Sequence, residues 1–331
     1  MTAHSRRSSI RKINLAFNRR VACVQAGLAL MPCAALAEEG GSGHYTAGAM
    51  ASFIDSVAAK ETFLLRLNLL NYSGSTGRNV EVPVAGLAAV DVNARSTALG
   101  VTALWRPPVE IAEGWSYAMS ATVPYVWMDV SANVEARGAS GRRSSNVSGL
   151  GDIVLMPVML NQNLGPDFNI NYRVAFYAPT GGYRVGRLAN TGKNFWTTEP
   201  TVGFMYFGQK NGIEASVFMG VDFNRRNADT DYKSGTQLHF DATFAQHFPW
   251  LGGLFGVGLN SFYYKQVSAD SGSGASFGAF EGKTAGLGPV ASFVAKAGGH
   301  DLIGEFKWIR ENTTQNRLKG DVVWLKVIYK F

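Results

Sequence analysis

The chain has 331 residues and a net charge of +7, and it is rich in apolar residues (46%), aromatic residues (12%) and glycine. Six of its 31 lysine and arginine residues, but none of its 24 acids, lie in the first 20 positions. The other 25 basic residues therefore nearly balance the acids. Because nucleic-acid binding depends on an excess of basic residues, this balance excludes a nucleic acid as the partner.

A basic segment, an apolar stretch and a small-residue site follow one another in residues 1–37. This order is typical of a secretory signal peptide. A first transmembrane helix would need about 20 apolar residues, and Gln25 and Pro32 interrupt the stretch. We therefore expect export and cleavage after Ala37, with Ala35 and Ala37 forming the cleavage site.

Cleavage would remove both cysteines, so the exported protein would have no disulfide. Residues 38–61 would then come first, and they show no period-two alternation. Apolar residues instead recur there at helical spacing, which predicts a short amphipathic helix. Two interpretations of this segment stay open, a periplasmic leader and a plug inside the domain that follows. The apolar residues are Met50, Phe53, Ile54 and Val57.

From residue 62 onward, apolar and polar residues alternate with a period of two, as in β-strands with two unlike faces. In 213–224, for example, Ile213 and Val217 alternate with Glu214 and Asp222. No run of about 18 apolar residues follows the signal peptide, so we expect no helical membrane span. Twelve such segments lie near residues 62–72, 93–105, 115–130, 149–160, 167–177, 196–207, 213–224, 236–247, 254–266, 283–296, 301–310 and 321–331.

Aromatic residues lie near the ends of these segments, as expected of strands with a lipid-facing band and aromatic girdles. The connectors alternate between short turns and longer polar stretches. Tight periplasmic turns and long extracellular loops produce this alternation in outer-membrane barrels, whereas a soluble sandwich has no reason to show it. We predict an all-β fold: a transmembrane antiparallel β-barrel of about 12 strands over residues 62–331, with a narrow lumen and both chain ends on the periplasmic side.

The residues of opposite parity to the apolar face should line the lumen. They carry both signs of charge, so many are expected to pair across neighbouring strands. A selective ion channel would favour a ring of one sign, and the mixture favours a general solute pathway. Aromatic members could offer a sliding surface to apolar solutes or fill space. The candidates are Arg66, Asn68, Asn171, Arg173, Glu199, Glu214, Phe218, Asp222, His239, Asp241, Tyr264, Glu305, Lys307, Trp324 and Lys326.

Some outer-membrane barrels are hydrolases, and a Ser–His–Asp triad is one arrangement that would support such an activity. His239 and Asp241 share a strand face, and Ser216 lies on the preceding segment. The chain has no G-x-S-x-G nucleophile elbow, and a His–Asp pair two residues apart recurs by chance in a polar lumen. The histidines show no metal-ligand spacing. We therefore expect no catalytic residue, no metal and no cofactor.

The last segment keeps its alternation up to the final residue of the chain. Val323, Leu325, Val327, Tyr329 and Phe331 share one parity. This face should meet lipid, with the terminal ring in the periplasmic aromatic girdle. We also expect Phe331 to serve as the signal that the outer-membrane assembly machinery recognises.

Several runs resemble a family of outer-membrane proteins named for the meta-pathway of phenol degradation, which includes sphingosine-induced members. The resemblance extends over nearly all of the chain after the signal peptide. It implies a single barrel associated with aromatic or lipid catabolism that admits hydrophobic substrates, and it supplies no binding residues. The runs are "GHYTAGAMASF", "GLGDIVLMPV", "YAPTGGY", "NTGKNFWTTEPTVGF", "DFNRRNADTDYKSGTQLHFD", "QVSADSGSGA", "GLGPV" and "KGDVVWLKVIYKF".

These observations predict an outer-membrane channel for passive uptake of small hydrophobic or aromatic compounds in a Gram-negative envelope. The expected partners are outer-membrane lipid, the solute and the assembly machinery. An alternative is a non-transporting barrel that acts as a structural or surface-interaction protein. A barrel hydrolase is the least favoured alternative.

Overall fold

The computed structural model describes residues 39–57, 60–77, 80–109, 111–136, 139–275 and 281–331. The predicted signal peptide and its cleavage site at Ala35 and Ala37 lie outside these ranges. Twelve long strands match the twelve predicted segments. They are β1 (Thr62–Ser75), β3 (Leu87–Arg106), β4 (Trp115–Ala136), β6 (Ile153–Asn163), β7 (Phe168–Ala178), β8 (Thr197–Phe207), β9 (Ile213–Asn224), β10 (Gln237–Trp250), β11 (Gly253–Gln266), β12 (Lys283–Ala297), β13 (His300–Gln315) and β14 (Lys319–Lys330).

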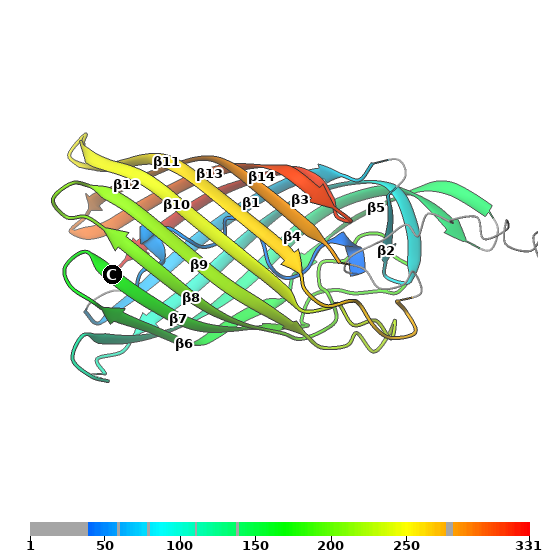
Figure 1. The fold of residues 1–331 in the computed structure, drawn as a ribbon, viewed down its shortest axis with the longest axis horizontal. Helices are drawn as coiled ribbons and strands as arrows, with labels where there is room; N and C mark the ends of the chain where they lie inside the picture. Colours follow the sequence, from blue (N-terminus) through cyan, green and yellow to red (C-terminus); the bar gives the residue numbers. More distant parts are fainter. Residues whose placement is uncertain (1–38, 58–59, 78–79, 110, 137–138, 276–280) are drawn as a thin grey trace, which may run out of the picture. The chain divides into compact units, whose positions relative to one another are not determined.

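The twelve strands close into one antiparallel barrel (Figure 1). Each strand pairs with its neighbours in the chain, apart from the two additional strands described below, and β1 pairs with β14 on one side and β3 on the other. Closure removes the free edges of the sheet, so every wall strand has a partner on both sides. The predicted twelve-strand transmembrane barrel is confirmed. No helix in the described ranges is long and apolar enough to cross a membrane.

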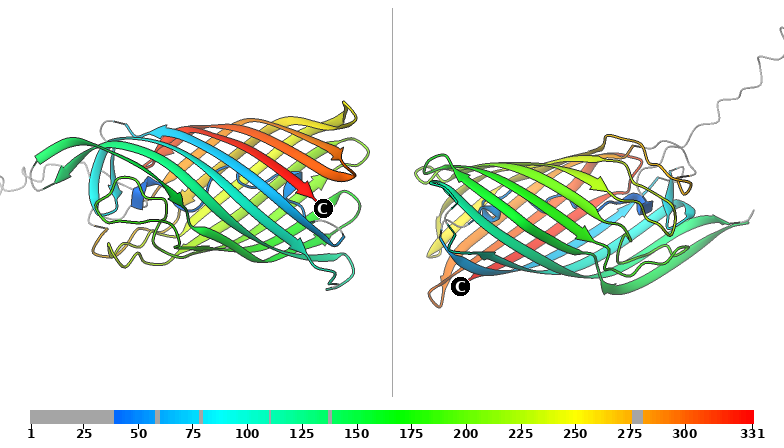
Figure 2. Two further views of the ribbon diagram at one scale, coloured as in Figure 1. Left: turned by 180° about the vertical axis from the view of Figure 1, so that it is seen from behind. Right: turned by 90° about the horizontal axis from the view of Figure 1, so that it is seen from below.

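Two additional strands lie largely between the predicted segments, in stretches expected to be loops. β2 (Glu81–Val84) pairs with the start of β3, and β5 (Ala139–Leu150) pairs with the second half of β4. β6 pairs with the first half of β4, so β5 and β6 share one edge of β4, each along a different half. Figure 2 shows the β4–β5 hairpin extending beyond the other strands. β5 was missed because it is rich in Ser, Gly and Arg and has no apolar face.

Strand β14 shows how the two faces differ. Val322, Lys326 and Ile328 are buried, whereas Leu325 and Phe331 are 45% and 56% exposed. The predicted parity of the last strand is thus confirmed. The outward face of the other strands likewise carries exposed leucine, valine and aromatic side chains, as a surface that faces lipid requires.

Residues 39–57, called the inner segment below, run inside the barrel rather than along its surface (Figure 1). Their helical content is two three-residue 3-10 turns, Glu39–Gly41 and Phe53–Asp55. The predicted amphipathic helix is therefore wrong. The physical reason is that wall side chains bind the backbone groups of the inner segment, so these groups do not need helical partners.

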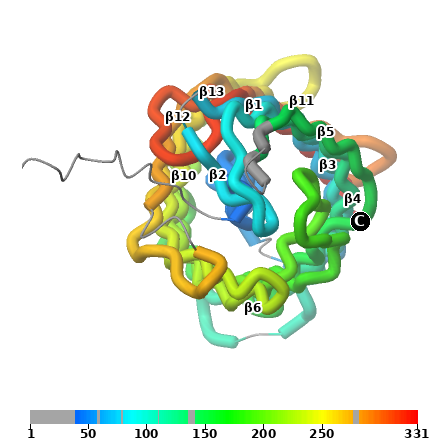
Figure 3. Tube along the Cα trace, turned by 90° about the vertical axis from the view of Figure 1, so that its right-hand side faces the viewer, coloured from blue at the N-terminus to red at the C-terminus, as the bar shows by residue number. Residues whose placement is uncertain are grey.

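The long-loop end of the barrel is covered by an apolar cluster, called the mouth cluster. It joins β2, the start of β3, the end of β4, the connector between β7 and β8 and the connector between β13 and β14. Figure 3, a view onto this end, shows β2 lying across the opening. The buried members are Val82, Val84, Ala89, Val92, Val130, Ala132, Val134, Leu188, Ala189 and Leu318.

Candidate functional site: the filled lumen and its side cavity

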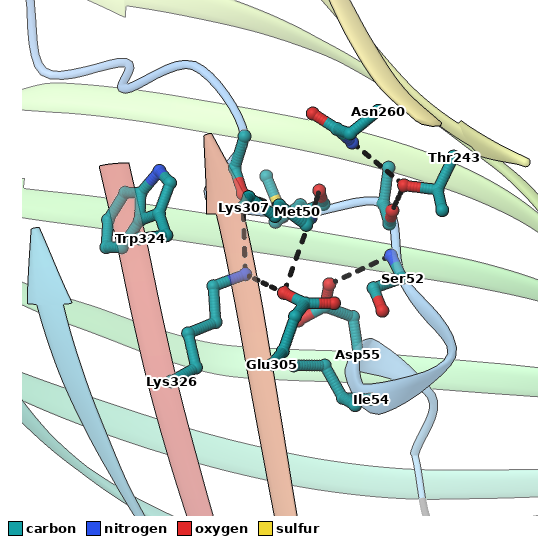
Figure 4. A network of polar contacts seen from close by, with 12 residues as sticks. Met50, Ser52, Ile54, Asp55, Thr243, Asn260, Glu305, Lys307, Trp324 and Lys326 are labelled. Carbon is teal, nitrogen blue, oxygen red and sulfur yellow. Dashed lines mark hydrogen bonds and ion pairs between the residues drawn. The ribbon is translucent and has the colours of Figure 1, made fainter. Parts of the chain in front are cut away.

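Two lysines of the wall bind the middle of the inner segment through its carbonyl groups at residues 48–50. Lys307 Nζ donates to the carbonyls of residues 48 and 50 at 3.2 and 3.0 Å, and Lys326 Nζ donates to that of residue 49 at 2.9 Å. Glu305 Oε1 lies 2.9 Å from Lys326 Nζ and 3.5 Å from Lys307 Nζ (Figure 4). All three side chains are almost fully buried, and their mutual pairing makes that burial tolerable.

Strand β10 holds the same part of the inner segment from another side. Asp241 accepts hydrogen bonds from the Tyr45 hydroxyl at 2.9 Å and from the Gly48 amide at 2.8 Å. Gly48 has φ of +75°, and a Cβ atom there would lie 2.4 Å from Ile309 Cδ1. Glycine is therefore required where the segment passes this close to β13.

Lower in the barrel, charged side chains fix the second 3-10 turn. Asp55 Oδ1 lies 3.0 Å from Arg66 Nη1 of β1, and Arg173 of β7 donates to the Asp55 carbonyl. Glu214 of β9 accepts from the Phe53 amide at 2.7 Å. Charge-assisted bonds of this kind are stronger than neutral ones, so the turn is anchored on three strands.

At the upper end, His44 joins the inner segment to Asp152, which lies between β5 and β6, and to Thr197 at the start of β8. Its Nε2 atom lies 3.0 Å from Asp152 Oδ2, and its Nδ1 atom lies 2.7 Å from Thr197 Oγ1. The carboxylate of Asp152 also accepts from the amides of Gly181 and Lys193 at 2.8 and 2.7 Å. Asp152 therefore organises the connector between β7 and β8 above the lumen.

A cavity of about 490 Å³ remains beside the inner segment. Its wall on β3 and β4 carries small or apolar side chains, and it reaches from the mouth cluster towards the short-turn end. There Val57 packs with Leu104, Ala118 and Met159 in an apolar cluster, called the lower cluster. The β3 and β4 wall residues include Ala94, Ser96, Ala98, Gly100, Thr102, Thr122, Pro124, Val126 and Met128.

The predicted lumen candidates point inward, and they fall into two groups. Arg66, Asn68, Arg173, Glu199 and Trp324 line the cavity. The others are buried among the wall and the inner segment. These are Asn171, Glu214, Phe218, Asp222, His239, Asp241, Tyr264, Glu305, Lys307 and Lys326. Their part in moving a solute stays a prediction.

Two of the aromatic candidates do not offer a sliding surface. Phe218 packs with Ala51 of the inner segment, and Tyr264 stacks on Tyr45 with ring centroids 5.7 Å apart. The β3 wall of the cavity was missed as a site. Its signal was a run of small residues at one parity, from Ala94 to Thr102, which leaves space that bulky neighbours would fill.

The nucleophile considered from the sequence is not assembled. β9 pairs with β10 so that Ser216 faces Thr243, whereas His239 faces Gly220. The Ser216 hydroxyl donates to Glu214 at 3.4 Å. The oxygens of Asp241 are engaged by the inner segment, as described above. This geometry gives no support to the hydrolase alternative.

Comparison with known proteins agrees with this architecture. Residues 73–327 match the model of the family described as "Putative MetA-pathway of phenol degradation". The chain belongs to this family. A search of curated proteins finds no match.

Among solved structures, the COG4313 outer membrane channel from Pseudomonas putida F1 is similar with a TM-score of 0.64 and 14% identity, covering 85% of this chain and 100% of that one. The beta domain of the Bordetella autotransporter BrkA (TM-score 0.47, 11% identity, 82% and 100% covered) and a Pseudomonas aeruginosa FadL homologue (0.37, 7%, 82% and 89%) are more distant. The fold is that of an outer-membrane channel, and the exposed apolar band agrees with a place in the outer membrane.

Proposed function

We propose that this protein is a channel for passive uptake of small hydrophobic or aromatic compounds across the outer membrane. The observation that carries the proposal is the cavity along β3 and β4. Its size suits a small organic molecule, and its wall of alanine, valine and methionine suits an apolar surface. Along β3 and β4 a strongly polar solute would find few hydrogen-bonding partners, at a cost that disfavours it, whereas side chains such as Asn68 and Arg173 elsewhere on the lining could bind a single polar group.

The two apolar clusters define the ends of the proposed path. A solute would enter beneath the mouth cluster, move along the β3–β4 wall and leave past Val57 at the lower cluster. The inner segment acts as a plug in this scheme, because it fills the rest of the lumen. In this scheme Val57 moves aside to open the lower end, because its packing partners in the lower cluster are apolar.

A matched pair of substitutions on β3 tests the path. Ala98→Phe places a ring in the cavity, whereas Leu99→Phe changes a neighbouring residue that is 37% exposed on the outer face. We expect Ala98→Phe to reduce uptake of a labelled monocyclic aromatic, at limiting concentration, several-fold in cells and in proteoliposomes. Leu99→Phe should transport like the wild type. Equal uptake by the two variants, at equal amounts of folded barrel, would contradict the proposal.

The inner segment, which fills much of the lumen, also favours a second candidate, a non-transporting barrel that acts through its loops. The two candidates differ in what removal of the inner segment does. A channel lacking residues 39–57 should conduct ions in a planar bilayer far more than the full chain. A purely structural barrel should show the same low conductance with or without the segment.

We further propose that Phe331 is the assembly signal. Its ring contacts Phe63 of β1 with centroids 5.8 Å apart and Tyr329 at 4.9 Å, on the outer face where the first and last strands meet. Phe331→Ala should lower the amount of heat-modifiable barrel in the outer membrane, whereas Phe331→Tyr should restore it. Normal assembly of the alanine variant would overturn this role.

A further inference from the structure

Among the described residues, three histidines contact carboxylates inside the barrel, and one of them has unusual spacing. His247 Nε2 lies 2.8 Å from Glu214 Oε2, and His44 Nε2 lies 3.0 Å from Asp152 Oδ2. Both are ordinary hydrogen-bond distances. His239 Nε2 instead lies 3.5 Å from Glu199 and 3.7 Å from a second carboxylate, that of Asp222.

Such separations are close to those between two ligands of one metal ion. Zinc binds histidine nitrogen at about 2.0–2.1 Å and carboxylate oxygen at about 2.0–2.2 Å, so two tetrahedral ligand atoms lie about 3.3–3.5 Å apart. The three ligand atoms of His239, Glu199 and Asp222 all lie within 4.8 Å of one another. The two separations from His239 Nε2, 3.5 and 3.7 Å, are already within a few tenths of an ångström of this tetrahedral spacing.

The histidine ring supplies an independent observation. His239 is fully buried, and all three carboxylates that its ring nitrogens face lie farther away than in an ordinary hydrogen bond: Glu199 and Asp222 from Nε2, and Asp241 at 3.9 Å from Nδ1. A buried imidazole normally has a partner at closer range, because its burial is otherwise costly. Its Nε2 atom is directed at the carboxylates of Glu199 and Asp222, and a metal ion between them would satisfy it.

The surrounding residues hold these side chains in place. Glu199 accepts from the Tyr177 hydroxyl at 2.6 Å and from the Thr201 hydroxyl at 3.1 Å, the kind of support that orients metal-ligating carboxylates. Gly220 faces His239 across the β9–β10 pair, and a Cβ atom there would lie 2.4 Å from His239 Nε2. Glycine at this position therefore makes room for the ring.

We propose that His239, Glu199 and Asp222 form a binding site for a divalent transition ion such as Zn²⁺. A divalent ion balances the charges of both carboxylates, and one imidazole with two carboxylates is a suitable ligand set. Glu199 lines the cavity, which gives the ion a route of entry. No pattern in the sequence indicates this site, because its ligands come from three strands, β8, β9 and β10.

A bound ion would also act on the inner segment. The ring of Tyr45 stacks on His239 with centroids 4.1 Å apart and an angle of 22° between the planes. The Tyr45 hydroxyl at the same time donates to Asp241. An ion that fixes the His239 ring therefore fixes the surface against which the inner segment packs.

The test uses the full mature chain without a histidine tag, purified in detergent and stripped with a chelator. Isothermal titration with Zn²⁺ should show one site per chain, and Co²⁺ should give the visible absorption of a tetrahedral complex. His239→Ala should weaken Zn²⁺ affinity by more than about 100-fold, since loss of a ligand costs more than loss of an outer-shell partner. His247→Ala is the matched control and should bind like the wild type.

Several results would overturn the site. One is a wild-type chain that binds no Zn²⁺; another is equal loss of binding in His239→Ala and His247→Ala. If His239→Ala gives no heat-modifiable barrel, Asp222→Asn and Gly220→Ala decide instead. Retained affinity in a folded Asp222→Asn variant would show that His239 and its carboxylates form only a direct ion pair.

Discussion

Strands β10, β13 and β14 meet the inner segment with Asp241, Lys307 and Lys326, which form hydrogen bonds with its backbone or Tyr45. Strands β3, β4 and β6 meet it differently. In the described part of the chain no hydrogen bond joins them to the segment, and their contact is apolar, through Val57. The half of the lumen lined by β10, β13 and β14 therefore binds the inner segment. The half lined by β3, β4 and β6 leaves open space beside it, which is the cavity.

This difference follows from what an irregular chain needs when it is buried. Backbone groups of the inner segment lack helical or strand partners, so wall side chains must satisfy them. The half that does so carries long polar side chains, and these fill the space. The half with small residues cannot reach the segment, and the space beside it stays open. A solute path and a firmly held plug can thus share one narrow barrel.

The largest expected effect is on the holding half. Lys307→Met together with Lys326→Met leaves Glu305 buried without these two cations, and uncompensated burial of a charge costs about 3–5 kcal/mol. We expect a lower urea midpoint for unfolding and more frequent channel openings in a planar bilayer. Lys296→Met is the control, because Lys296 is 71% exposed and its pair with Asp301 is worth at most about 1 kcal/mol. Equal stability of the two variants would mean that the lysines do not hold the segment.

A smaller effect is expected on the stability of the connector between β7 and β8, which covers the cavity. Asp152→Ala removes the acceptor of the Gly181 and Lys193 amides, and such a loss costs about 1–3 kcal/mol. The connector should then open and become sensitive to trypsin at Lys193 and nearby arginines. Asp129→Ala, an exposed change on β4, should leave cleavage unchanged. If trypsin cuts both variants at the same rate, Asp152 does not keep the connector closed.

The smallest effect is a pH response in an exposed loop at the mouth. Hydrogen bonds from the side chain and amide of Ser273, and then from Arg226, lower the pKa of Asp231 to about 2 from an ordinary value of 3.8. Because the folded-state pKa is depressed, the contact stabilises the loop above about pH 4, and this contribution is lost as the pH falls towards 2. An NMR titration of the Asp231 carboxyl carbon, assigned with Asp231→Asn, should give a midpoint near 2. A midpoint at the ordinary value would show that these contacts do not persist in solution.

The strands could be predicted from the sequence because one face of each strand contacts lipid and must be apolar. In β9, Val217 and Val221 had to point outward, which assigned Glu214 and Asp222 to the lumen without any coordinates. The same reasoning could not find β5, since it is polar on both faces and forms only because β4 offers it an unpaired edge. The same reasoning also could not predict that Lys307 binds the inner segment whereas Asn68 lines the cavity.

The sequence by itself determined the class of fold, the number of wall strands and the parity of each, because a period of two is a local property of the chain. Tertiary structure alone decided which lumen residues meet one another. His239 comes close to Glu199 and Asp222 only through the register of three strands. The course of the inner segment likewise depends on side chains more than 180 residues away, such as Asp241. Contacts over such separations leave no pattern in a single sequence, and they determine where the lumen is filled and where it is open.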